Sequence, residues 1–257
     1  MITLRSADEL VKLRAANQLV ATILAELRRM AVPGATTGEI DAEAERLVRA
    51  AGAEPAFKGY RGFPGTICAS VNHEVVHGFP STRPLVEGDI LSVDMGVKLE
   101  GYYGDSAVTV PVGRISTAAE RLLEVTEASL YAGIDAVRVG GRVSDIGHAI
   151  QQHVEAHGFS VVREFVGHGI GTKLHEEPQV PNYGPPGRGP RLAEGMVLAI
   201  EPMVNEGRAA VRVLSDGWTA VTVDGMLSAH FEHTVAVGAD GAEVLTMRPA
   251  TAETAVG

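Results

Sequence analysis

The sequence predicts an α+β fold in which helices cover antiparallel strands, and in which the whole arrangement occurs twice. A long helical pattern followed by a short one occurs early in the chain and again after residue 114. A strand pattern with one embedded acid also occurs twice, as EGDILSVDMGV at residues 87–97 and EGMVLAIEPMV at residues 194–204. We therefore expect a single catalytic domain, residues 1–257, made of two pseudo-symmetric halves of about 1–113 and 114–257.

The first helix pair is marked by two capping boxes. Ser6 and Glu9 form one box, and we expect a helix from Ser6 or Ala7 to about Ala31. Its apolar residues keep helical spacing: Leu10, Leu13, Val20, Ile23, Leu24 and Leu27. Thr36 and Glu39 form the second box, and the shorter helix that follows is expected to stop at Gly52.

The second helix pair lies within residues 116–158 and aligns with the first. At an offset of 106 residues the identical residues are Gly34 and Gly140, Ile40 and Ile146, Val48 and Val154, Ala50 and Ala156, and Gly52 and Gly158. The strand segments align at an offset of 107, through Glu87 and Glu194, Gly88 and Gly195, Leu91 and Leu198, and Val97 and Val204. Helix pair and strand therefore repeat together and in the same order.

The repeated strands carry acids at matching positions. Asp94 falls where Glu201 falls, each within an aliphatic run where an unpaired charge is costly to bury. A hairpin after Asp94 places Asp105 on the next strand, and FEHTVAVG places Glu232 at the position matching Asp105. If the halves pack about a pseudo-twofold axis, these four carboxylates converge between them.

Four neighbouring carboxylates stay ionised only if cations compensate their charge, and two divalent metals would do so. A single acid of this kind more often pairs with an arginine or caps a turn, but four at repeated positions favour a metal site. An oxygen-rich ligand set suits manganese, iron or cobalt better than a structural zinc site, while zinc remains compatible with affinity alone.

Histidines near this site come from GHGIGTKLHEEPQV, which supplies His168 and His175. The glycines beside His168 allow close backbone approach, which fits a ligand held on a turn. GHGIGT lacks the spacing of a phosphate-binding loop. Three histidines on the predicted short helix are expected at the solvated surface: His148, His153 and His157. For His73, His230 and His233 both packing and support of the metal ligands remain open.

The charge and composition of the chain indicate which classes of partner to exclude. The chain has 257 residues, 45% of them hydrophobic, and a formal net charge of −10 without a basic run, which argues against nucleic acid or an anionic membrane as the main partner. There is no signal pattern and no apolar run of about 20 residues. Cys68 is the single cysteine, so a reducing cytoplasm is the expected location.

With NHEVVHGFP and GHGIGTKLHEEPQV, the set Asp94, Asp105, His168, Glu201 and Glu232 resembles the type I methionine aminopeptidases, metallopeptidases of family M24 with the duplicated pita-bread (creatinase/aminopeptidase) fold. The resemblance covers nearly the whole chain. It implies that those five residues hold two divalent metal ions, cobalt, manganese, iron or zinc, and that His77 and His175 are active-site histidines that do not bind metal. YRGFPGTICASVNHEVVHG also resembles the family's substrate pocket, so Tyr60, Phe63, Cys68 and Trp218 are implied to surround the methionine side chain.

The implied activity is removal of the initiator methionine from nascent proteins and peptides when the second residue is small. Glu201 is the expected general base and His175 the expected donor to the carbonyl oxygen, with His77 near the scissile amide. The implied partners are the amino termini of nascent polypeptides, with the ribosome as a candidate site of action. The protein is expected to be a monomer. Because the chain starts at Met1, we expect the minimal form without amino-terminal extensions. Asn72 and Ser228 match positions that help bind a monovalent cation, or they serve turn and strand hydrogen bonding.

Two alternatives stay open at this point. Prolidases and Xaa-Pro aminopeptidases use the same fold and ligands, although they usually carry a large amino-terminal domain, and only about 90 residues precede Asp94 here. A metal-free binding protein on this fold is the second alternative. Such proteins lose ligands, whereas this sequence keeps all five.

Overall fold

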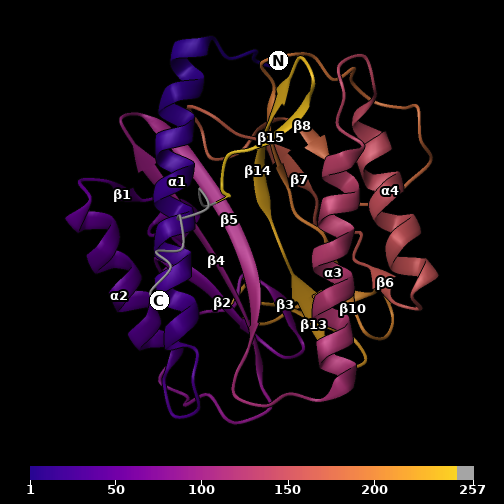
Figure 1. The fold of residues 1–257 in the computed structure, drawn as a ribbon. Coiled ribbons are helices and arrows are strands. Elements are labelled where there is room, and N and C mark those ends of the chain that lie inside the picture. Colours follow the sequence, from indigo (N-terminus) through magenta and orange to yellow (C-terminus); the bar gives the residue numbers. More distant parts are fainter. Residues whose placement is uncertain (248–257) are drawn as a thin grey trace, which may run out of the picture.

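Two pairs of helices cover the strands, one pair from each half of the chain (Figure 1). The computed structural model describes residues 1–247, and residues 248–257 of the predicted domain lie outside the described residues. Helices α1 (Ala7–Met30) and α2 (Thr37–Ala50) form the first pair, and α3 (Thr117–Asp135) and α4 (Val143–Ala156) form the second. Both predicted capping boxes are present, at Ser6 with Glu9 and at Thr36 with Glu39.

The first sheet is built around a long hairpin. Strands β4 (Ile90–Leu99) and β5 (Tyr102–Pro111) pair antiparallel through a two-residue turn, Glu100 and Gly101, both with positive φ. Strands β2 (Ile67–Val71) and β1 (Glu54–Pro55) pair with β4. Asp94 lies opposite Ala107, and Asp105 lies opposite Gly96. Because alternate residues share a face, the two acids project from the same side of the hairpin, as predicted.

The second sheet has five antiparallel strands in the order β15–β14–β9–β7–β8. Their bounds are β7 (Gly167–Gly169), β8 (Glu176–Val180), β9 (Val197–Ile200), β14 (His233–Gly238) and β15 (Gly241–Val244). His168 lies opposite Ala199 in this sheet. His168 is therefore on the same side of the sheet as the residue two positions beyond Ala199, which is Glu201.

Two three-stranded sheets and a short helix complete the fold. One sheet joins β6 (Ser160–Val161), β10 (Met203–Asn205) and β13 (Ser228–His230), and the other joins β3 (Glu74–Val76), β11 (Val211–Val213) and β12 (Ala220–Thr222). The 3-10 helix η1 (Tyr60–Gly62) precedes β2.

The second acid-bearing strand differs from its prediction. Residues 194–204 were expected to form one buried strand, but β9 ends at Ile200 and β10 begins at Met203. Pro202 lacks the N–H that a continuous ladder requires, so Glu201 lies at a break between strands. Glu232 lies at a similar break, between β13 and β14. Asp94 and Asp105, in contrast, lie inside continuous strands.

Contacts between β5 and β14 join the two sheets, with α1 packed on β4 and β5 and α3 packed on strands of the second half (Figure 1). The backbone N–H of Glu232 donates to the carbonyl of Ala107 at 2.9 Å. The Ser106 hydroxyl donates to the carbonyl of Glu232 at 2.6 Å, and the Thr234 hydroxyl donates to that of Asp105 at 2.8 Å. These bonds bring Asp105 and Glu232 from distant parts of the chain to one place.

The buried apolar side chains form separate clusters. One lies within residues 16–112, and a second comprises Ile90 and residues of the range 119–237. Two further clusters combine residues from both sides of residue 113, so a division near that residue stays a prediction. Among the helices of residues 1–247, none has the length and apolar character needed to cross a membrane.

Candidate active site

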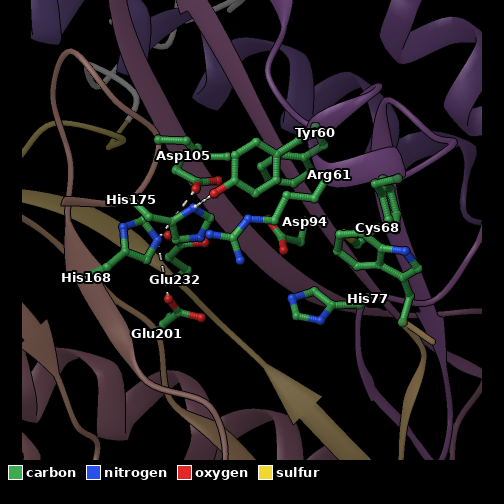
Figure 2. A pocket seen from close by; sticks show the side chains of 14 residues that line it. Tyr60, Arg61, Cys68, His77, Asp94, Asp105, His168, His175, Glu201 and Glu232 are labelled. Carbon is green, nitrogen blue, oxygen red and sulfur yellow. Dashed lines mark hydrogen bonds and ion pairs between the residues drawn. The ribbon is translucent and has the colours of Figure 1, made fainter. Parts of the chain in front are cut away.

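A cavity of about 380 Å³ opens where the two sheets meet, and every residue predicted to act in catalysis, bind the methionine or bind divalent metal lines it (Figure 2). The acids and His168 come from both sheets and from the breaks between strands. Around them lie two further histidines and the predicted pocket residues: His77, His175, Tyr60, Phe63, Cys68 and Trp218. The structure therefore brings together residues that are up to 172 positions apart in the sequence.

The metal-binding geometry centres on Asp105, His168 and Glu232. Each offers one ligand atom, and these three atoms lie within 4.8 Å of one another. His168 Nε2 also lies 3.6 Å from an oxygen of Glu201 and 3.9 Å from Asp105 Oδ2. Asp94 lines the same cavity. Five residues with oxygen and nitrogen donors thus face one volume.

The backbone around His168 explains how it is held. Its Nδ1 donates to the carbonyl of Gly169 at 2.9 Å, so the neutral ring keeps its lone pair on Nε2, the atom that faces the acids. A Cβ on Gly167 would collide with the carbonyl of Ala199, and one on Gly169 would collide with that of Glu177. The predicted close backbone approach beside His168 is therefore present, but the predicted turn is wrong, because His168 lies within strand β7. Burial lowers the pKa of His168 to about 3, which keeps the ring neutral.

The carboxyl groups are buried without enough compensating charge. Burial and the nearby Glu201 raise the pKa of Asp94 to about 7, and burial raises that of Glu201 to about 8. The pKa values of Asp105 and Glu232 are raised well above their usual range, by burial first and then by the neighbouring acids.

In the described part of the chain, three buried carboxyl oxygens have no partner, which indicates that a bound cation would offset the free-energy cost of burying these groups. Within residues 1–247, Asp94 Oδ1, Asp105 Oδ1 and Glu232 Oε1 are buried and have no hydrogen-bond partner. Such oxygens are costly unless a cation binds them. The mainly oxygen donor set with one imidazole therefore fits divalent metal binding.

His230, for which two roles were open, lies against this cluster. It is buried on β13, and its Nε2 lies 3.6 Å from Glu201 Oε2. His168 and His230 therefore approach Glu201 at its two different oxygens. Burial lowers the pKa of His230. Its position two residues before Glu232 on the chain was the available signal, since alternate residues of an extended segment share a side.

His175 stands at the mouth of the cavity, with its ring centroid 4.2 Å from that of His168. Partial burial and the charge of Arg61 lower its pKa. Sequence reasoning did not single out Arg61, which lines the cavity and has a φ of 48°. The only signal was its place in the YRGFPG segment. A non-glycine residue with positive φ is uncommon and marks a constrained position.

His77 lies deeper, beside the aromatic residues. Its ring makes edge contacts with Phe165, at a centroid distance of 5.3 Å, and with Trp218, at 6.0 Å. Its backbone φ is 62°, a left-handed conformation that fixes the direction of the side chain. Burial, with smaller contributions from the two nearby histidines His230 and His175, lowers its pKa to about 4.

The other end of the cavity is apolar. Phe63 and Trp218 meet edge to face with centroids 5.2 Å apart, and Cys68 is buried beside them. Phe57 and Leu174 also line the cavity, and the sequence did not predict either. Their apolar side chains could not be distinguished from core residues by pattern alone.

The remaining histidines lie outside the cavity, and those expected at the surface are at least partly exposed. His148 and His153 are partly exposed on α4, and His157 is exposed just after its end. His73 is exposed, while His233 bonds to Thr246 at 2.8 Å and to Tyr131 at 3.2 Å.

Asn72 and Ser228, the residues predicted either to help bind a monovalent cation or to form local hydrogen bonds, both form local hydrogen bonds. The Asn72 side chain donates to Asp89 at 2.7 Å and accepts from the Ile90 N–H at 3.0 Å. The Ser228 hydroxyl donates to Asn205 at 2.8 Å.

A buried carboxylate and imidazole cluster beside an open cavity, on this duplicated fold, defines a metal-dependent hydrolase. The chain belongs to metallopeptidase family M24, whose model matches residues 11–239. It is 56% identical over 246 residues to methionine aminopeptidase 1 of Bacillus subtilis, covering 96% of this chain and 99% of that one. It is 53% identical to the methionine aminopeptidase of Clostridium perfringens, with coverage of 96% and 99%.

Solved structures of methionine aminopeptidases have the same fold as this chain. The methionine aminopeptidase of Thermotoga maritima matches with a TM-score of 0.95 at 47% identity, covering 96% of this chain and all of that one. The expected pita-bread fold is thereby confirmed. The prolidase of Pyrococcus horikoshii matches with a TM-score of 0.77 at 20% identity, and the match covers only 64% of that chain, so it shows the fold alone.

Proposed function

We propose that this protein removes the amino-terminal methionine from nascent proteins and peptides whose second residue is small, by hydrolysis assisted by two divalent metal ions. The observation that carries the proposal is one cavity with a metal-binding cluster at one end and an apolar, aromatic pocket at the other (Figure 2). Relatives with 50–56% identity over nearly the full length are named methionine aminopeptidases.

The proposed metal ligands are Asp94, Asp105, His168, Glu201 and Glu232. The unpaired buried oxygens and the neutral His168 ring support this assignment. Cobalt, manganese, iron or zinc would suit the donor set. When bound, the metals would lower the pKa of a water towards neutrality and polarise the scissile carbonyl.

Glu201 is the proposed general base as well as a ligand. It takes the proton of the attacking water and passes it to the leaving amine. Glu201 lines the cavity, with Oε1 near His168 and Oε2 near His230. Each of those two imidazoles lies 3.6 Å from one oxygen of Glu201.

The histidines at the reacting amide are proposed to act as neutral rings. His175 donates to the carbonyl oxygen as negative charge develops there, and a neutral imidazole is sufficient for that donation. Its lowered pKa agrees with this role. His77 contacts the substrate near the scissile amide, and its pKa of about 4 keeps it uncharged at neutral pH.

The methionine side chain is proposed to occupy the pocket of Tyr60, Phe63, Cys68 and Trp218. An unbranched thioether packs well against aromatic rings and sulfur. The edge-to-face contact of Phe63 with Trp218 gives the pocket a closed aromatic wall. A charged side chain would lose its hydration in this pocket without gaining a partner, so we expect peptides with a charged first residue not to be cleaved.

Partners and location complete the proposal. The substrates are nascent polypeptide amino termini, with the ribosome as the proposed place of encounter, and the protein is proposed to act as a cytoplasmic monomer. A monovalent cation near Asn72 and Ser228 stays a prediction, next to local hydrogen bonds that already engage both side chains.

Metal analysis combined with peptide hydrolysis tests the proposal. The purified protein is assayed for bound cobalt, manganese, iron and zinc, and then for hydrolysis of Met-Ala-Ser before and after chelation. We expect bound divalent metal and chelation-sensitive release of methionine. Preferential cleavage of Xaa-Pro bonds, or activity that survives complete chelation, would contradict it.

A further inference from the structure

Arg5 is a buried arginine outside the cavity. It precedes Ser6, the N-cap of α1, and its side chain is only 4% exposed. Its backbone N–H donates to the carbonyl of Gly195 at 2.7 Å, which attaches this segment to the chain leading into β9. A guanidinium is rarely buried unless other groups pair with it, so its partners indicate what it does.

Two carboxylates pair with Arg5. Nη2 forms an ion pair with Glu176 Oε2, and Nη1 lies 3.4 Å from Glu9 Oε1 on α1. Glu176 is the first residue of β8 and directly follows His175 in the chain. Its side chain is 12% exposed, so this ion pair is shielded from solvent on both sides.

The second oxygen of Glu176 holds the loop that leads to His175. Oε1 accepts from the backbone N–H of Thr172 at 2.9 Å and from that of Lys173 at 3.0 Å. It also accepts from the Thr172 hydroxyl at 3.3 Å. One carboxylate therefore fastens residues 172–173 on one side of His175 to the start of β8 on the other.

The guanidinium also packs directly against this loop. A Cβ on Gly171 would collide with the Arg5 guanidinium, so the glycine leaves the space that the arginine fills. The carbonyl of Gly171 accepts from the Tyr103 N–H on β5 at 2.8 Å. The His175 loop is thus held between β5 and the segment before α1.

We propose that Arg5, acting through Glu176, is a positioning residue for His175. The Arg5–Glu176 pair holds the 171–175 loop so that the imidazole stays at the cavity mouth, where it meets the substrate carbonyl. This inference rests on the proposed function, in which His175 donates to that carbonyl. It connects the amino-terminal segment to catalysis, although no atom of Arg5 lines the cavity.

A surface pair provides the matched control. Arg14, on the same helix that follows Arg5, makes a two-bonded ion pair with Glu243 at 2.6 and 2.8 Å. Their side chains are 42% and 46% exposed, and neither residue lines the cavity. Arg14→Ala therefore removes a comparable link to the second half of the chain without affecting the site.

The test is a double-mutant cycle with His175, measured on Met-Ala-Ser with metal-loaded protein. We expect Arg5→Ala to lower kcat roughly tenfold, with KM and bound metal within twofold of the wild type, and Arg14→Ala to change none of these. Arg5→Lys should recover part of the loss, because it keeps the charge. In a His175→Ala background, Arg5→Ala should have almost no further effect, because a residue that acts only through His175 has nothing left to position.

An equal loss in both backgrounds would overturn the inference, since Arg5 would then act on the fold and not through His175. If Arg5→Ala does not fold, Glu176→Gln replaces it in the cycle. The glutamine can still accept from the loop N–H groups, but it has no charge to pair with Arg5. A wild type that does not release methionine from Met-Ala-Ser would instead contradict the proposed function, so the two failures can be distinguished.

Discussion

The hydroxyl oxygen of Tyr60 lies 3.1 Å from Nδ1 of His175 (Figure 2). A tyrosine hydroxyl that donates to Nδ1 leaves the proton of the neutral imidazole on Nε2. That is the tautomer in which Nε2 can donate to a substrate carbonyl. Tyr60 was predicted from the sequence only as part of the methionine pocket, and the structure adds this contact.

Tyr60→Phe tests the contact while keeping the ring in the pocket. A single hydrogen bond contributes a net 0.5–1.5 kcal/mol, so we expect kcat to fall by roughly 2- to 13-fold with KM little changed. Steady-state kinetics on Met-Ala-Ser measure both constants. Tyr183→Phe, which removes a hydroxyl outside the cavity, serves as the control. A rise in KM at constant kcat would show that the hydroxyl binds substrate instead.

His175→Ala removes the proposed donor to the developing oxyanion. We expect kcat to fall by roughly 10² or more, the usual scale for such a loss. Bound metal, measured on the same preparation, should be unchanged. Loss of metal from this variant would make His175 a ligand and would contradict the division of roles between His168 and His175.

Asp105→Asn and Glu232→Gln test the metal ligands. Each variant replaces a buried charged oxygen that faces the cluster, so we expect metal content and peptidase activity to be lost together. The fold should be largely retained, because the change removes charge from a site between the sheets and leaves the apolar clusters intact. Glu243→Gln, at an exposed acid, is the control. Normal turnover with normal metal content in either ligand variant would refute the assignment.

The raised pKa values predict how the metal-free protein responds to pH. The pKa of Asp94 moves from 3.8 to about 7, and that of Glu201 from 4.5 to about 8. Below about pH 6.5 the lowered pKa values of His77 and His168 oppose the carboxyl groups, because the unfolded chain then binds imidazole protons that the folded chain does not. Above that pH the folded carboxyl groups keep protons that the unfolded chain has released, so stability falls as pH rises from about 7 to 8. Bound divalent metal replaces the protons and should flatten this dependence.

Urea unfolding at pH 7.0, 7.5 and 8.0, with and without a chelator, measures this effect. The free energy of unfolding of the chelated protein should decline across the series. Asp94→Asn combined with Glu201→Gln should reduce the decline, because both titrating groups are gone. A metal-free stability that rises with pH over this interval would contradict the buried-carboxylate account.

Local patterns predicted the helices well. The capping boxes at Ser6 and Thr36 marked where α1 and α2 begin, because capping depends on residues three apart in the sequence. The repeat predicted that acids from both halves meet, although their burial could be established only in the folded chain. The break at Pro202 was visible in the sequence but was outweighed by the aliphatic residues around it.

Long-range contacts could not be predicted in the same way. The Arg5–Glu176 pair joins residues 171 positions apart, and nothing in either local segment indicates the other. The left-handed backbone of His77 has no marker in the sequence, because such conformations usually favour glycine or asparagine. Phe57 and Leu174 have the composition of core residues, and only their position shows that they face the cavity.

The central claim concerns specificity, and one peptide series tests it most directly. The metal-loaded protein is given tripeptides that vary the first residue, with Ala second, and then the second residue, with Met first. We predict cleavage after methionine, appreciable cleavage after norleucine, weaker cleavage after leucine and none after charged residues, since shape alone discriminates by about 1–3 kcal/mol per methylene. Peptides with Gly, Ala or Ser at the second position should be cleaved, whereas those with Leu, Lys or Phe should not. A formylated or acetylated terminus should prevent cleavage. Indifference to methionine at the first position, or preferential cleavage of Xaa-Pro bonds, would contradict the account.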